Sequence, residues 1–143
     1  MTPSARISAA IEILDSIERQ HLPAEALKAW GQSHRFAGSK DRTAIGTLVF
    51  DALRRKASSA YLMGEETSRA IMLGALKQMR GLDVEAIGAL FSGAQYAAEA
   101  LSEAEIARLI NGNIDDAPAH VQGDYPQWLA DGFAAAFGDE AAA

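Results

Sequence analysis

The chain contains 143 residues, carries a net charge of -6 at pH 7 and has no cysteine. A chain of this length fits one domain that withdraws roughly two-thirds of its unfolded surface from water. The absence of cysteine excludes disulfides, thiolate metal sites and cysteine nucleophiles. No apolar run approaches the roughly 18 residues that a membrane span requires, and residues 1–6 lead into an amphipathic pattern instead of a signal-peptide core. We therefore expect a cytoplasmic protein without a membrane partner.

The composition predicts an all-α fold, a bundle of about seven to eight helices. Alanine is abundant, and β-branched residues are few and scattered, which favours helix over strand. Apolar residues recur every three or four positions over residues 4–19, and a short amphipathic helix is expected over residues 24–33. A third helix is expected to begin at Ser39 as its cap and to end in the bases of residues 54–56, which complement the negative end of the helix dipole.

Turn and cap residues divide the second half of the chain. Short helices are expected over residues 58–63 and 66–80, with Gly64 and Gly81 just after their last turns. Asp83 is expected to cap the next helix. The pattern of residues 102–105 is a capping box that opens a helix reaching about residue 111.

The last part of the chain is expected to differ from the rest. Residues 111–124 are rich in turn formers and predict an ordered loop or linker. An eighth helix is predicted from Pro126, with Trp128, Leu129, Phe133 and Phe137 at roughly helical spacing and no stop signal before the chain ends. We therefore expect a helical domain over residues 1–124, and a C-terminal helix over residues 125–143 that leads toward a domain this chain lacks.

Charge is unevenly distributed along the sequence. Residues 35–56 carry six bases against two acids, a local net charge of +4, whereas residues 81–143 carry one base against eleven acids. The first stretch suits contact with phosphates and the second does not. The six bases are Arg35, Lys40, Arg42, Arg54, Arg55 and Lys56.

The sequence offers no catalytic or metal centre. Its three histidines do not stand at metal-ligand spacing from one another, and Asp116 and His120 share a proline-containing loop that does not place them on one helical face. No glycine-rich phosphate loop follows a strand, and no serine occupies a strand-to-helix elbow. Trp30, Trp128 and the phenylalanines are candidates for base stacking, but aromatic residues on the apolar face of a helix are more often core residues, and Trp30 and Trp128 are interpreted mainly in that way.

Residues 34–42 are the most suggestive segment. They place two arginines, a lysine and a histidine around a predicted helix N-terminus, where exposed N–H groups and the dipole favour an anion. Arg35, Lys40 and Arg42 are thus candidates to contact phosphate. The alternative, a solvated turn in which Asp41 and Arg42 have no ligand, fits the same residues.

Two motifs resemble a known family. Residues 33–42 (SHRFAGSKDR) and 48–56 (LVFDALRRK) are similar to the N-terminal domain of bacterial 16S ribosomal RNA cytosine-5 methyltransferases of the Sun or RsmB type, itself similar to the antitermination factor NusB. Residues 9–15 (AAIEILD) and 125–129 (YPQWL) extend the resemblance over almost the whole chain. The pattern D-R-x-x-I-x-x-L-V-F-x-x-L-R-R is its most specific part.

The resemblance implies a NusB-like RNA-binding domain that positions 16S ribosomal RNA for a catalytic domain. In the family, S-adenosylmethionine and the catalytic cysteines belong to that other domain, so this chain alone is not expected to be an enzyme or to bind a cofactor. The expected partners are ribosomal RNA and the chain's own methyltransferase domain, and no DNA is expected. The RNA contacts are placed at Arg35, Lys40, Arg42, Arg54, Arg55 and Lys56. The alternative is a protein-interaction module, which docks on its own catalytic domain or acts as a subunit like the antitermination factor.

Overall fold

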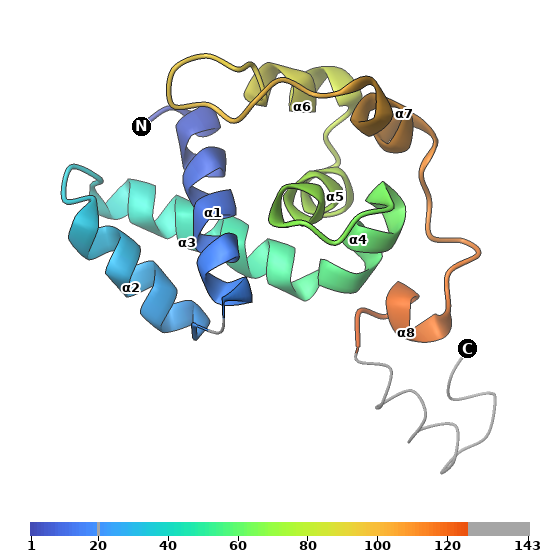
Figure 1. Cartoon of the computed structure of the whole chain (residues 1–143), viewed down its shortest axis with the longest axis horizontal. Helices are drawn as coiled ribbons and strands as arrows, with labels where there is room; N and C mark the ends of the chain where they lie inside the picture. Colours follow the sequence, from blue (N-terminus) through green and yellow to red (C-terminus); the bar gives the residue numbers. More distant parts are fainter. Residues whose placement is uncertain (20, 126–143) are drawn as a thin grey trace, which may run out of the picture.

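The computed structural model describes residues 1–19 and 21–125, and within these ranges the fold is all-α, as predicted (Figure 1). It contains helices and no strand in this part of the chain. The described helices are α1 (Pro3–Glu18), α2 (Pro23–Ser33), α3 (Ser39–Arg54), α4 (Lys56–Met63), α5 (Ser68–Arg80), α6 (Val84–Leu90), α7 (Glu103–Asn111) and α8 (Ala119–Gln122). The predicted helix from Pro126, with Trp128, lies outside the described residues.

Most helix ends follow from the local sequence. Asp83 caps α6 by accepting a hydrogen bond from the Ala86 N–H, and Ser102 forms the predicted capping box with Glu105 at the start of α7. Gly64 and Gly81 end α4 and α5 in the left-handed conformation, which costs glycine nothing. These predictions are confirmed.

Two local predictions are wrong. Gly38, not Ser39, is the N-cap of α3, so the capping residue has no side chain that could accept a hydrogen bond from the first turn. Residues 111–124, predicted as a loop or linker, include the single turn of α8 after Pro118. A turn of four residues is too short to produce a hydrophobic period, so the pattern could not reveal it.

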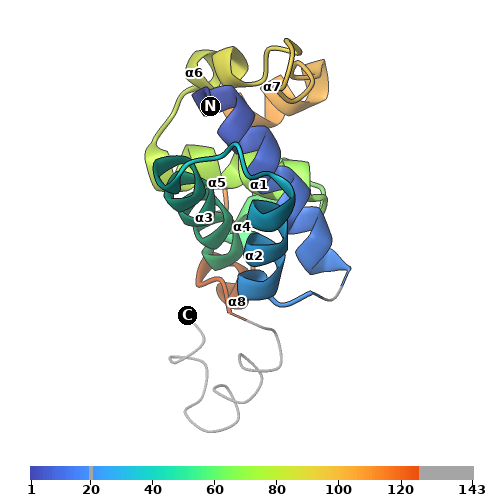
Figure 2. The same cartoon turned by 90° about the vertical axis from the view of Figure 1, so that its left-hand side faces the viewer.

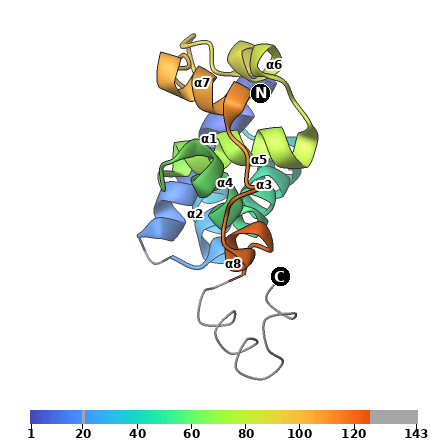
Figure 3. The same ribbon diagram turned by 90° about the vertical axis from the view of Figure 1, so that its right-hand side faces the viewer.

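Helix α5 lies at the centre of the bundle. Its residues from Ala70 to Leu76 are all buried, and it packs against α1, α3 and α4. Figure 1 views it nearly end-on between these helices. Its closest neighbour is α4, because Gly74 lies directly against Ser59. Figures 2 and 3 show α6 and α7 covering one end of the bundle and α8 lying at the other.

Candidate nucleic-acid interface

The six predicted RNA-contacting bases form two groups at opposite ends of α3. Arg35 lies just before α3, and Lys40 and Arg42 lie in its first turn, so residues 34–42 are together called the α2–α3 turn. Arg54, Arg55 and Lys56 form the second group, at the junction between α3 and α4. A helix of 16 residues is roughly 24 Å long, so the bases do not form one compact cluster. The two ends of α3 are well separated in Figure 1.

The bases of the α2–α3 turn are exposed and unneutralised. Arg35, Lys40 and Arg42 are all exposed, and none has an ion pair among the described residues. The nearest acid in sequence, Asp41, is held elsewhere: Arg6 Nη2 lies 2.8 Å from its Oδ1, and the N-terminal ammonium lies 3.5 Å away. The hydrogen bond from Arg6 lowers the pKa of Asp41 below its ordinary value. The turn therefore keeps its positive charge.

The N-terminus of α3 adds to this field. Because Gly38 has no side chain, the first N–H groups of α3 have no side-chain cap. A 16-residue helix also directs the positive end of its dipole to the same place. Backbone and side chains thus favour an anion at this end of α3.

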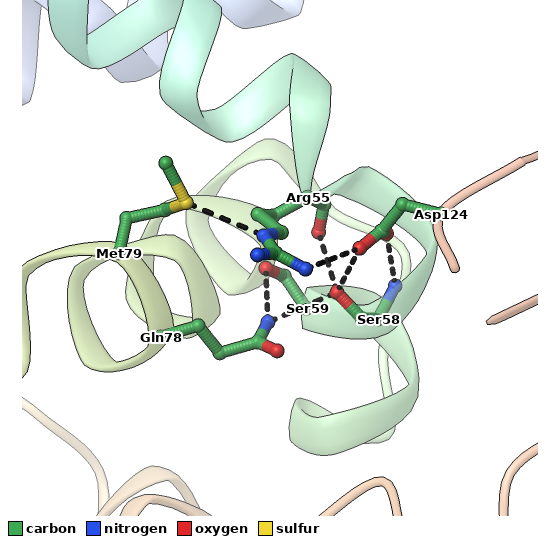
Figure 4. Close-up of polar contacts among 6 residues, drawn as sticks. All are labelled: Arg55, Ser58, Ser59, Gln78, Met79 and Asp124. Carbon is green, nitrogen blue, oxygen red and sulfur yellow. Dashed lines mark hydrogen bonds and ion pairs between the residues drawn. The ribbon is translucent and has the colours of Figure 1, made fainter. Parts of the chain in front are cut away.

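At the α3–α4 junction, Arg55 has a structural role that its sequence position does not reveal (Figure 4). Its Nη1 lies 3.4 Å from Oδ2 of Asp124, and its Nε lies 3.3 Å from the Met79 sulfur. The same carboxylate accepts hydrogen bonds from the backbone N–H of Ser58 at 2.8 Å and from the Ser58 hydroxyl at 2.7 Å. Arg55 and Asp124 thereby connect the end of α8 to the start of α4.

The other two bases of the junction are paired more loosely. Lys56 Nζ lies 2.5 Å from Glu18 Oε1, and both side chains are about half exposed. Arg54 is 68% exposed and reaches Asp51 only at 3.9 Å. Exposed pairs of this kind contribute little to stability, so Arg54 and Lys56 are available to a ligand more readily than Arg55.

One face of α3 joins the two groups. Lys40, Thr43, Thr47, Phe50 and Arg54 recur every three or four residues, and all five are exposed. Phe50 is 41% exposed despite its aromatic side chain. This face of α3 therefore has a cation at each end, Lys40 and Arg54, with two threonine hydroxyls and the Phe50 ring between them.

An aromatic groove adjoins the α2–α3 turn, and it contains Trp30 and Phe36, two of the rings that the sequence offers as candidates for base stacking. The rings of Trp30 and His34 stack with centroids 4.3 Å apart and planes 7° apart, and Phe36 meets His34 edge-on at 5.8 Å. Tyr96, from the loop between α6 and α7, lines the same groove. No pattern in the sequence indicates that Tyr96 lines the same groove as Phe36, which stands 60 positions earlier.

Residues 1–19 and 21–125 contain no group of three or more histidine, cysteine or acidic residues that could hold a metal ion. In those same ranges, no helix combines the length and apolarity that crossing a bilayer would require.

Comparisons with known proteins add no relative. No family model, no curated protein and no solved structure matches this chain.

Proposed function

We propose that this chain is an RNA-binding accessory domain that positions ribosomal RNA for an S-adenosylmethionine-dependent cytosine-5 methyltransferase domain outside this chain. The proposal combines the resemblance of residues 33–56 to the NusB-like domain of such enzymes with the charge of the α2–α3 turn. No catalytic role is assigned to any residue of this chain.

The exposed bases of the α2–α3 turn are the main support for RNA binding. Arg35, Lys40 and Arg42 are exposed and form no ion pair within residues 1–19 and 21–125 of a protein of net charge -6, while the acid between Lys40 and Arg42 is held by Arg6. Exposed cations that are close together in sequence and have no acidic partner stay available to phosphates. Phosphate contact by such a group is mainly recognition of the RNA backbone and its shape.

Two charge-matched double variants test this proposal. Arg35→Gln with Arg42→Gln removes two cations from the turn, whereas Arg19→Gln with Arg108→Gln removes two exposed cations elsewhere. Both variants have the same net charge. With a 16S-derived RNA fragment at low salt, we expect the first variant to bind about tenfold more weakly, about 1.4 kcal/mol, and the second to bind almost as the parent does.

A third double variant examines the junction. Arg54→Gln with Lys56→Gln leaves Arg55 in its structural place, and a loss of RNA affinity would extend the interface along α3. If the parent chain binds no RNA at low salt, or if all three variants bind equally, the proposal is wrong.

A second candidate function, docking of a protein partner, is favoured by the outer face of α7. Ile106 and Ile110 stand one turn apart and are 37% and 59% exposed, beside the exposed Glu103. Such an apolar stripe with an acidic border suits a protein surface better than RNA. If Ile110→Asp abolishes association with a separately produced methyltransferase domain and leaves RNA binding intact, this function is supported.

A further inference from the structure

We infer that the aromatic groove beside the α2–α3 turn receives an unpaired base of single-stranded RNA, with Phe36 and Tyr96 as its two stacking surfaces. This inference rests on the proposed RNA-binding function and specifies the form of RNA that is bound. If a base binds in this groove, the domain recognises unpaired nucleotides in addition to the phosphate backbone.

The groove has enough volume and a suitable lining for a nucleobase. It has a volume of about 630 Å³ and lies among the start of α1, the α2–α3 turn and the α6–α7 loop. These three segments lie together on the left-hand side of Figure 1, and Figure 2 views that side directly. Thr2, Ser8, Glu12 and Gln95 supply hydroxyl, carboxyl and amide groups able to bond the edge of a base.

The two outer rings are exposed without structural need. Phe36 is 74% exposed and Tyr96 is 76% exposed, so neither contributes a buried side chain to the core. By contrast, Trp30 at the inner end of the row is only 7% exposed. Large aromatic rings left in water on two walls of one groove are typical of stacking platforms, since every base presents a flat face.

The backbone at Tyr96 supports the same conclusion. Its φ angle is +68°, in the left-handed region that a bulky residue rarely adopts. The side chain recovers none of that cost through burial. Outliers of this kind concentrate at ligand-binding positions, where a fixed ring direction is useful.

Charge decides between a nucleic acid and a purely apolar ligand. Arg35 stands between His34 and Phe36 in sequence, and Lys40 and Arg42 follow within one turn of helix. A base in the groove would therefore have its flanking phosphates on the side of three exposed cations that have no ion pair in the described part of the chain. The single acid lining the groove is Glu12, among the residues that the structure describes.

A fluorescent base analogue tests the inference in the full 143-residue chain. The probe is a ten-nucleotide oligouridine with one 2-aminopurine at its centre, and the comparison is the same strand paired with its complement. We expect binding of the single strand to quench the 2-aminopurine, and the duplex to bind more weakly with no such change. Equal binding of strand and duplex, with unchanged fluorescence, would overturn the inference.

Single substitutions locate the base. Phe36→Ala and Tyr96→Asn should each weaken single-strand binding by about 5-fold to 150-fold and remove the quenching, whereas Phe36→Tyr and Tyr96→Phe should retain both. Asparagine is chosen because it accepts the positive φ angle at position 96. Tyr61→Ala, which removes another exposed ring on α4, is the matched control and should change neither signal.

The outcomes separate the two proposals. If Phe36→Ala and Tyr96→Asn bind and quench as the parent does, while Arg35→Gln with Arg42→Gln still weakens binding, the groove inference fails and the RNA-binding function stands. If the parent chain does not bind the oligonucleotide and also fails to bind the 16S-derived fragment, both fail.

Discussion

Asp124 shows how one side chain can determine local architecture. Its side chain is 5% exposed, and its carboxylate receives two hydrogen bonds from Ser58 and an ion pair from Arg55. Ser58 is itself completely buried, so its N–H has no water to replace a lost partner. A carboxylate is the group that can accept all three donors at once.

Asp124→Asn should lower the free energy of unfolding by about 1–3 kcal/mol, because the amide replaces an acceptor with a donor that faces other donors. Asparagine tolerates the positive φ angle of 56° at this position, so backbone strain does not contribute. Urea denaturation measures the effect, and Asp116→Asn on the exposed surface is the control, expected within about 0.5 kcal/mol of the parent. Equal stability of the two variants would contradict the role given to Asp124.

The carboxyl group of Glu105 has a lowered pKa, so its contribution to stability depends on pH. Two nitrogens of Arg69 donate to its carboxylate at 2.7 and 2.9 Å, and these bonds lower its pKa, with a further contribution from the Ser102 N–H. A lowered pKa means that the folded state favours the ionised form. The resulting stability is present above the ordinary glutamate pKa of about 4.3 and is lost as the pH falls through the lowered value.

Glu105→Gln should therefore destabilise the protein by about 1–2 kcal/mol at pH 7 and by less as the pH falls below about 4. Urea midpoints at pH 7 and pH 3 test this, with Glu103→Gln, an exposed acid of the same helical turn, as the control. A difference from the parent chain that is the same at both pH values would refute the assigned titration.

At the scale of elements, the packing of α4 against α5 depends on a missing side chain. A Cβ at Gly74 would lie 2.4 Å from the Ser59 Cβ and 2.6 Å from its Cα, so the two helices would have to separate. At Gly46 in α3, an added Cβ meets nothing within 4 Å. Helix packing therefore requires glycine at position 74, whereas position 46 has room for a side chain.

Gly74→Ala should destabilise the fold by about 1–3 kcal/mol through overpacking, whereas Gly46→Ala should stabilise it by about 0.5–1 kcal/mol through helix propensity. Thermal or urea unfolding of both variants measures the two signs. If both substitutions stabilise, α4 and α5 are not in close contact at Gly74.

The elements that could be predicted are those that local chemistry determines. Periodicity gave α1 and α3, and the cap residues Asp83 and Ser102 gave the starts of α6 and α7. The open cap at Gly38 and the single turn of α8 have no local signature, so they were not predicted. Sequence order also indicated the basic stretch, but the partner of Arg55 is 69 residues away and only the fold brings Asp124 to it.

At the scale of the whole molecule, the uneven charge determines how binding should respond to salt. The chain is acidic overall, so long-range repulsion and the local attraction of the α2–α3 turn act against each other. Added salt screens both, but counterion release depends only on the phosphates that are contacted.

For a single strand, the slope of log K against log salt should be about -2 if Arg35, Lys40 and Arg42 each neutralise one phosphate, at roughly 0.7 per contact. Arg35→Gln with Arg42→Gln should reduce its magnitude by about 1.4, and Arg19→Gln with Arg108→Gln should leave it unchanged. Fluorescence anisotropy between 50 and 200 mM salt (about a fourfold range) measures the slopes. Equal slopes for the two variants would remove these cations from the interface.

The contacts of Asp124 also hold the end of α8 at a defined distance from the three bases beside α2. Because its carboxylate accepts hydrogen bonds from the first turn of α4, Asp124 lies near the C-terminal end of α3, whereas Arg35, Lys40 and Arg42 lie near the N-terminal end, roughly 24 Å away. The length of α3 therefore sets the separation between the end of α8 and the place where RNA is proposed to bind.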